Sequence, residues 1–201
     1  MSTKHISLST VAGLFNLKGT YQLAFSFLFG MSVWISFFGG RVSSRLFATP
    51  LTVRRAGVIA YKTLPRPQFG ALQHKTFPIY FLLSQALGGG VLAIYVFEHP
   101  AVLTQYASPR VPEVAQAYTL LFAILLQSTN YFIVGPMTSK TMFQRMRLEK
   151  DEGKSYTDAG ISDAMKALNR RFGMLHGVSS LANLGAVFAL AFHGLWIGNG
   201  L

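Results

Sequence analysis

The sequence predicts an all-α membrane protein with four transmembrane helices and a cytoplasmic helical hairpin between the third and the fourth. Of its 201 residues, 51% are hydrophobic and 12% are charged, whereas a soluble domain carries about 25% charged residues. Four long runs contain no Asp, Glu, Lys or Arg. At about 1.5 Å per residue, each run can cross a hydrocarbon core of about 30 Å. We therefore expect one four-span membrane domain over residues 20–201, with spans at residues 20–40, 77–97, 114–135 and 172–196.

Residues 1–19 form an N-terminal arm that carries few charges. The arm lacks the compact apolar core of a secretory signal peptide, so we expect no cleaved signal. Its Ser and Thr content and its lack of acidic residues are typical of a mitochondrial transit peptide, but it contains no arginine. A short amphipathic arm that lies on the membrane is the alternative, so both an endomembrane and a mitochondrial membrane stay open.

The first span, residues 20–40, is followed by a basic loop over residues 41–76. The loop carries seven Lys and Arg residues and no acidic residue. We expect it to contact anionic lipid headgroups, and recognition of an acidic partner is the alternative. The net charge of +11 therefore requires no nucleic acid. The residues predicted to contact headgroups are Arg41, Arg45, Arg54, Arg55 and Lys62.

The second span, residues 77–97, contains three consecutive glycines at 88–90, which favour close packing against another helix. The third span, residues 114–135, carries several uncharged polar side chains that we expect to face protein rather than lipid.

Residues 136–171 form the predicted helical segment between the last two spans. Pro136 is expected to begin a helix capped by Thr138 or Ser139, and Gly153 to end it. Ser162 is expected to cap the long helix that contains the fourth span.

The distribution of basic residues predicts the orientation. Of the 18 Lys and Arg residues, 15 lie in the two long connections at 41–76 and 136–171. The positive-inside rule therefore places both connections in the cytoplasm and both termini on the opposite side.

Three segments in order carry a resemblance: LPRPQFGALQHKTFPIYF, NYFIVGPMTSKTMFQRMRLEKDEG and LNRRFGMLHGVSSLANL. From about residue 57 onward the chain resembles the transmembrane protein 205-like family. The resemblance implies a four-span integral membrane protein of eukaryotes with undefined biochemical activity and no catalytic residues. Residues 41–57 are extra relative to the family pattern, and a private lipid contact or interface there is one reading. The motif residues that the resemblance implies are Arg66, Phe69, Gly70, Gln73, Pro78, Pro136, Arg145 and Glu149.

Catalytic groupings are hard to assemble from this sequence. It contains no cysteine, and all seven acidic residues lie outside the predicted spans. We therefore predict no enzymatic activity, no metal and no cofactor. The best candidate binding site is a polar cluster between the third and fourth spans. Its side chains would orient a substrate or a proton, or would simply bond one another between helices. The cluster comprises Gln127, Asn130, His176, Ser180 and Asn183.

Two further patterns have a functional and a structural reading. His74 with His176, and His99 with His193, lie near opposite ends of the second and fourth spans, as bis-histidine haem ligands would. Their spacing fits a membrane poorly, and ordinary hydrogen-bonded histidines are the alternative. The methionines of the segment after the third span suggest either soft-metal binding or helix packing, and packing is the reading we adopt.

Arg145 and Glu149 are spaced to lie side by side on one helix. They form either a lock between cytoplasmic segments or a solvent-exposed pair. As to role, we expect an accessory or scaffold component of a membrane assembly or of trafficking machinery, with other membrane-protein subunits as partners. A small transporter or exporter that uses the polar cluster is the alternative, and a bis-histidine haem redox protein is the third candidate.

Overall fold

The computed structural model describes residues 6–38 and 64–200. Four of its helices are long and apolar enough to cross a membrane, and the described part of the chain contains no strand. The predicted all-α membrane fold with four spanning helices is thus confirmed. The five residues predicted to contact lipid headgroups lie outside the described residues, and so does the extra segment. They are Arg41, Arg45, Arg54, Arg55, Lys62 and residues 41–57.

The first two long helices pack against each other. α2 (Leu17–Val33) continues into a π-helical segment, η1 (Trp34–Phe38). α4 (Arg66–Glu98) begins well before the predicted second span. Pro67 in its first turn suits a helix start, because the missing N–H would have no partner there in any case. Pro78 lies inside α4, at the start of its apolar part.

The third span and the segment after it form one continuous helix rather than two. α6 (Pro112–Thr129) runs through the π-helical η2 (Asn130–Val134) into α7 (Gly135–Glu152). Pro136 explains the π-helical turn, since its ring would clash with the carbonyl four residues earlier and it has no N–H to donate. The helical turn therefore contains one extra residue, and the Gly135 N–H donates to the Asn130 carbonyl five positions earlier.

The predicted cap at the start of this segment is not formed, because the helix does not restart there. The Thr138 hydroxyl donates to the Val134 carbonyl inside the helix, at 2.7 Å. Ser139 bonds instead to His74 of α4, at 3.1 Å. The expected end is present: Gly153 has a left-handed conformation with φ of 62°, which glycine adopts without steric cost.

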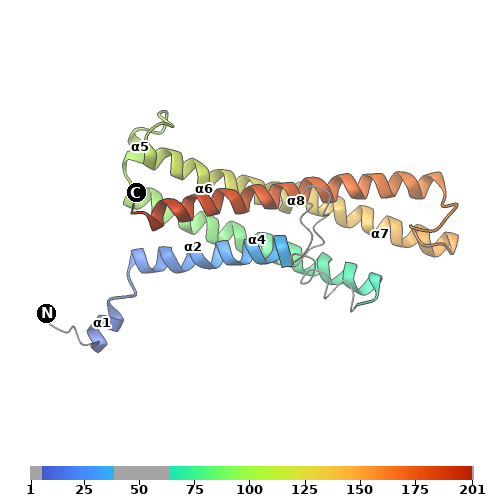
Figure 1. Cartoon of the computed structure of the whole chain (residues 1–201), viewed down its shortest axis with the longest axis horizontal. Helices are drawn as coiled ribbons and strands as arrows, with labels where there is room; N and C mark the ends of the chain where they lie inside the picture. Colours follow the sequence, from blue (N-terminus) through green and yellow to red (C-terminus); the bar gives the residue numbers. More distant parts are fainter. Residues whose placement is uncertain (1–5, 39–63, 201) are drawn as a thin grey trace.

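The last long helix, α8 (Asp163–Gly198), begins where the sequence predicts. The Ser162 hydroxyl accepts a hydrogen bond from the Met165 N–H at 3.1 Å. The helix is long enough to run past α7 and then along the whole bundle (Figure 1).

The four long helices form a closed bundle in which α2, α4, α6 and α8 each contact two neighbours. Its core is apolar and is built from all four helices, with Leu28, Val91, Leu120 and Leu190 among its members. Two short helices, α1 (Leu8–Ala12) and α5 (Ala101–Thr104), flank the bundle. Both termini lie at one end, and α7 with the first half of α8 forms the opposite end (Figure 1).

Candidate functional site

The centre of the bundle contains part of the predicted polar cluster. The Asn130 side-chain amide donates to the Asn183 side-chain oxygen at 3.1 Å and to the Ser179 carbonyl at 3.2 Å. Both asparagines are buried. The structure thus brings together η2 and α8 through a neutral hydrogen-bonded pair, as expected where charge is costly.

Gln127 belongs to the same layer of buried polar side chains across the bundle, which we call the central layer. It bonds to another helix. Its amide donates to the Tyr80 hydroxyl of α4 at 2.9 Å, and that hydroxyl donates to Ser32 of α2 at 3.4 Å. Side-chain oxygens of Gln127 and Asn130 remain buried without a hydrogen-bond partner among the described residues. The layer therefore joins all four helices, and Tyr80 and Ser32 are members that the sequence alone did not single out.

His176 and Ser180 are not part of this layer. His176 is half-buried and stacks on Phe172, with ring centroids 5.9 Å apart. Ser180 is exposed on the outer face of α8. Only Gln127, Asn130 and Asn183 of the five predicted residues gather at the centre.

A second buried polar group lies at the end of the bundle that carries the termini. His193 is completely buried, and its Nδ1 atom bonds to the Gln116 side-chain oxygen at 2.9 Å. Its Nε2 atom bonds to the Tyr21 hydroxyl. The ring of Tyr95 packs edge-on against His193, with centroids 5.3 Å apart. We call these four residues the His193 cluster.

The His193 cluster bears on the haem hypothesis. Both ring nitrogens of His193 have hydrogen-bond partners, so neither presents a free lone pair to an iron. His99 bonds to the Tyr95 carbonyl at 2.8 Å and stacks on the Tyr95 ring. The arrangement fits interhelical hydrogen bonding and does not fit an axial haem ligand at His193.

A third group lies at the opposite end of the bundle, where several motif residues meet. Arg66 of α4 forms an ion pair with Glu149 of α7 at 2.5 Å. The Arg66 guanidinium lies 3.5 Å from the centre of the Tyr156 ring, and that of Arg145 lies 4.2 Å from it. Arg145 also lies over Phe172 of α8, at 4.6 Å. These five residues are called the Tyr156 cluster.

The loop between α7 and α8 is fixed by the backbone of Tyr156. Its N–H donates to Glu149 at 2.7 Å, and its carbonyl accepts from Asn169 at 2.9 Å. Arg145 is 5% exposed. Burial lowers the pKa of Arg145 below its ordinary value, and the neighbouring Arg66 adds to this shift. The guanidinium nevertheless stays protonated at neutral pH, because arginine begins from a very high pKa.

The Tyr156 cluster was only partly accessible to sequence reasoning. Arg145 and Glu149 were expected to lie side by side, either as a lock between segments or as a solvent-exposed pair. Glu149 instead pairs with Arg66, which lies 83 positions away in the chain, and Arg145 is buried. Tyr156 was missed. A single aromatic residue in a short polar loop is its only sequence signal.

Gly70, another motif residue, permits close contact between α4 and α7. A Cβ atom at this position would lie 2.6 Å from the Met146 methyl group and 2.9 Å from the Met142 sulfur. These two methionines therefore pack against a helix backbone, which agrees with the packing interpretation. The described residues contain no group of three or more His, Cys, Asp or Glu side chains that could hold a metal ion.

The remaining motif residues lie near the same helices. Phe69 and Gln73 are half-buried in the first turns of α4, and Pro78 and Pro136 are exposed at the positions described above.

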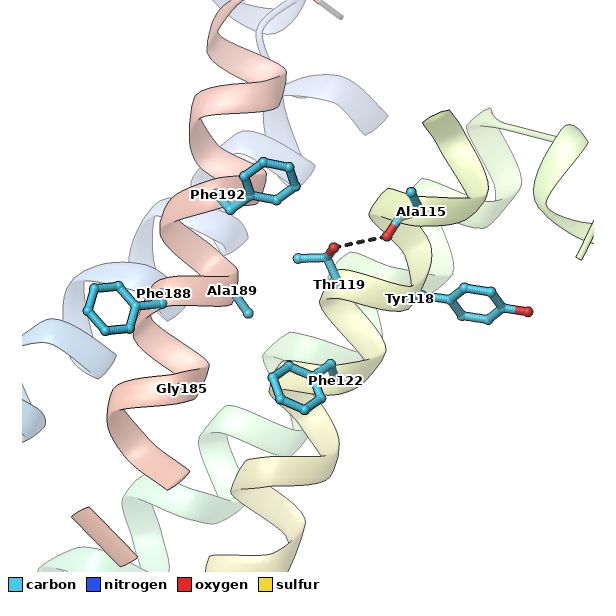
Figure 2. A pocket seen from close by; sticks show the side chains of 8 residues that line it. All are labelled: Ala115, Tyr118, Thr119, Phe122, Gly185, Phe188, Ala189 and Phe192. Carbon is cyan, nitrogen blue, oxygen red and sulfur yellow. Dashed lines mark hydrogen bonds between the residues drawn. The ribbon is translucent and has the colours of Figure 1, made fainter. Parts of the chain in front are cut away.

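A groove opens on the outer surface of the bundle, between α6 and α8 (Figure 2). Its volume is about 470 Å³. Thr119 and Ala189 point toward each other across it, and Tyr118 extends away from α8 (Figure 2). The Thr119 hydroxyl donates to the Ala115 carbonyl at 2.9 Å, so it is already paired. The α6–α8 groove is lined by Ala115, Tyr118, Thr119, Phe122, Gly185, Phe188, Ala189 and Phe192.

Comparison with known proteins identifies a family model and a curated relative. A family model described as "Domain of unknown function (DUF4149)" matches residues 23–147. The chain is 26% identical over 195 residues to Transmembrane protein 205 from Danio rerio, and the match covers 90% of this chain and 91% of that protein. No solved structure matches the chain.

Proposed function

The chain belongs to the DUF4149 family, and from this premise we propose that it is a non-enzymatic accessory or scaffold component of a membrane assembly or of trafficking machinery. In this role the α6–α8 groove receives a transmembrane helix of another subunit. The observation that carries the proposal is the groove itself, since it faces outward and lies within the apolar part of two spanning helices.

The floor of the groove suits a helix backbone. Ala115 and Thr119 on α6, and Gly185 and Ala189 on α8, are small residues spaced four positions apart. Such pairs allow another helix to approach closely, which favours association in a membrane, where packing rather than hydrophobic burial holds helices together. The groove exposes aromatic rings at its edges, including Phe188 and Phe192. These rings would enclose the side chains of the incoming helix.

The bundle interior supports an accessory role over a catalytic one. His193 and Asn183 use their side chains to hold neighbouring helices. Interhelical bonds of this kind contribute about 0.6–2 kcal/mol each. A scaffold requires this rigidity, because a partner binds best to a surface that is already formed.

Photocrosslinking tests the groove directly. A photoreactive amino acid placed at Phe192, in the groove, is compared with one at Phe27 on α2, since the two side chains are similarly exposed at 54% and 58%. We expect a protein crosslink from position 192 and mainly lipid adducts from position 27. Native mass measurement in mild detergent should show the same assembly.

A matched pair of substitutions gives the control. Ala115→Leu fills the groove and should remove both the crosslink and the assembly, whereas Ala86→Leu lies on the exposed face of α4 and should leave both intact. Lipid adducts alone at both positions, together with a protein that runs as a lone protomer, would refute the proposed role.

One observation favours the alternative of a small transporter or exporter. Gln127 and Asn130 each hold a buried side-chain oxygen without a partner among the described residues, and unsatisfied polar groups inside a membrane protein often mark a path for solute. If Asn183→Ala abolishes export from vesicles while Ser180→Ala does not, this function replaces the accessory role.

The proposal includes an orientation and a compartment. The positive-inside rule favours the Tyr156 cluster on the cytoplasmic side and both termini opposite, in an endomembrane or a mitochondrial membrane. Anionic headgroups are the proposed partners of the basic loop. A tag on Leu201 that reacts with reagents confined to the cytosol would overturn this orientation.

A further inference from the structure

The chain segment before the first spanning helix exposes large apolar side chains. Leu8, Phe15 and Ile6 are 87%, 86% and 85% exposed, and Leu14 is 67% exposed. Isolated exposed apolar residues are common on proteins, but several within one short segment indicate a surface that something covers. No residue of α1 is buried, and the helix lies apart from the bundle (Figure 1).

The segment has a defined shape, because its polar groups are bonded among themselves. Ser7 and Thr10 form a capping box at the start of α1. Asn16 closes the turn that follows: its amide donates to the Gly13 carbonyl at 2.7 Å, and its side-chain oxygen accepts from the Gly19 N–H at 2.8 Å. The same asparagine thus caps α2, and the chain changes direction between the two helices.

The covalent connection fixes the depth of the segment in the membrane. The apolar helix of the first span begins at Leu17, directly after the Asn16 cap. A segment that leaves the bundle at this point lies at the boundary between headgroups and hydrocarbon. Helices with one apolar side and one polar side lie flat at that depth.

We propose that residues 6–16 form an interfacial anchor, with Leu8 and Phe15 inserted among the lipids of the leaflet at the end of the bundle where both termini lie. Ser9 and Thr10 then face the headgroups. The partner is the lipid surface rather than a protein groove, because the position follows from continuity with α2 and because the side chains of Ser7, Thr10 and Asn16 are hydrogen-bonded within the segment.

The natural lack of cysteine allows a direct test on the full chain. Leu8→Cys and Phe15→Cys variants are labelled with an environment-sensitive fluorophore, and Ser9→Cys serves as the matched control on the polar side. Each protein is placed in nanodiscs that contain one copy of the chain and a mixture of neutral and anionic phospholipid.

The expected result is a blue-shifted emission at positions 8 and 15, quenching there by lipids labelled in the acyl chain, and iodide quenching several-fold weaker than at position 9. Equal iodide quenching at all three positions would overturn the proposal. It would also be overturned if protection appeared only in discs with two copies, since a second chain would then cover the segment. Neither result depends on the α6–α8 groove, so the two proposals fail separately.

Discussion

At the end of the bundle that carries both termini, the buried side chain of His193 has only neutral hydrogen-bond partners, whereas at the opposite end the Tyr156 ring contacts two guanidinium groups. In each cluster the ring of one residue, His193 or Tyr156, contacts side chains from several helices. They differ in charge, because His193 belongs to a spanning segment and Tyr156 lies in the loop beyond one.

The difference shows that the polarity of the surroundings determines which kind of side-chain contact is stable. In hydrocarbon an unpaired charge is expensive, so uncharged side chains satisfy one another. Near water, arginine retains its charge and packs its flat, weakly hydrated guanidinium on an aromatic face. The ion pair between Arg66 and Glu149 then offsets part of the positive charge. Four mutational experiments test these contacts and the packing of the bundle.

The largest effect is expected for His193→Ala. The change removes a completely buried ring and leaves Tyr21 and Gln116 without their partner, so the free energy of unfolding should fall by about 3 kcal/mol. Reversible unfolding in mild detergent measures it. His176→Ala, at a half-buried position outside the cluster, should cost less than about 1 kcal/mol. Equal losses for the two variants would contradict the role assigned to His193.

Tyr156→Ala should lower the free energy of unfolding by about 2 kcal/mol, because two cation–π contacts are lost together. Tyr156→Phe keeps the ring face and the backbone bonds to Glu149 and Asn169 and loses only the contact of the hydroxyl with Arg145, so it should cost less than the alanine variant. Proteolysis of the loop after Gly153 offers a local readout, and only the alanine variant should be cut faster. A phenylalanine variant as unstable as the alanine variant would show that the hydroxyl, not the ring, holds the loop.

A double-mutant cycle on Asn130 and Asn183 should give a coupling energy of about 0.6–1.7 kcal/mol, the range found for hydrogen bonds between helices inside membranes. The same cycle between Asn130 and Ser180 should give a value near zero, because Ser180 is exposed. If both cycles gave the same coupling, the central layer would not depend on this bond.

The smallest effect separates two adjacent glycines of α4. A Cβ atom at Gly88 would lie 2.9 Å from the Cγ1 atom of Ile124, whereas one at Gly89 meets nothing within 4 Å. Gly88→Ala should therefore destabilise the bundle by about 1 kcal/mol. Gly89→Ala should be neutral or slightly stabilising, since alanine favours a helix. Thermal unfolding of the two variants in parallel measures the difference, and the reverse order would rule out the packing of α4 on α6 described here.

The elements of the fold were largely predictable, because the signals that define them are local. Uncharged runs indicate the four spanning helices, and the cap at Ser162 and the stop at Gly153 are read from neighbouring residues. The continuous helix through Asn130–Val134 was not foreseen. Proline is common at the first position of a helix. Only the structure shows that a π-helical turn accommodates Pro136 inside a continuous helix.

The partners of polar side chains were less predictable. The predicted cluster included His176, Ser180 and Asn183, whose spacing of four and seven positions puts them on one side of α8, yet only Asn183 is buried in the bundle interior. Residues three or four positions apart share a broad sector of a helix, and the burial of each depends on where the neighbouring helices lie.

By itself the sequence determined that the chain crosses a membrane four times as helices, because both the apolar length and the backbone hydrogen bonds of a helix are properties of consecutive residues. The tertiary structure alone decided that Glu149 pairs with Arg66, that two arginines contact the Tyr156 ring and that His193 bonds to Tyr21 and Gln116. These contacts join residues far apart in the chain, and they exist only once the helices have packed.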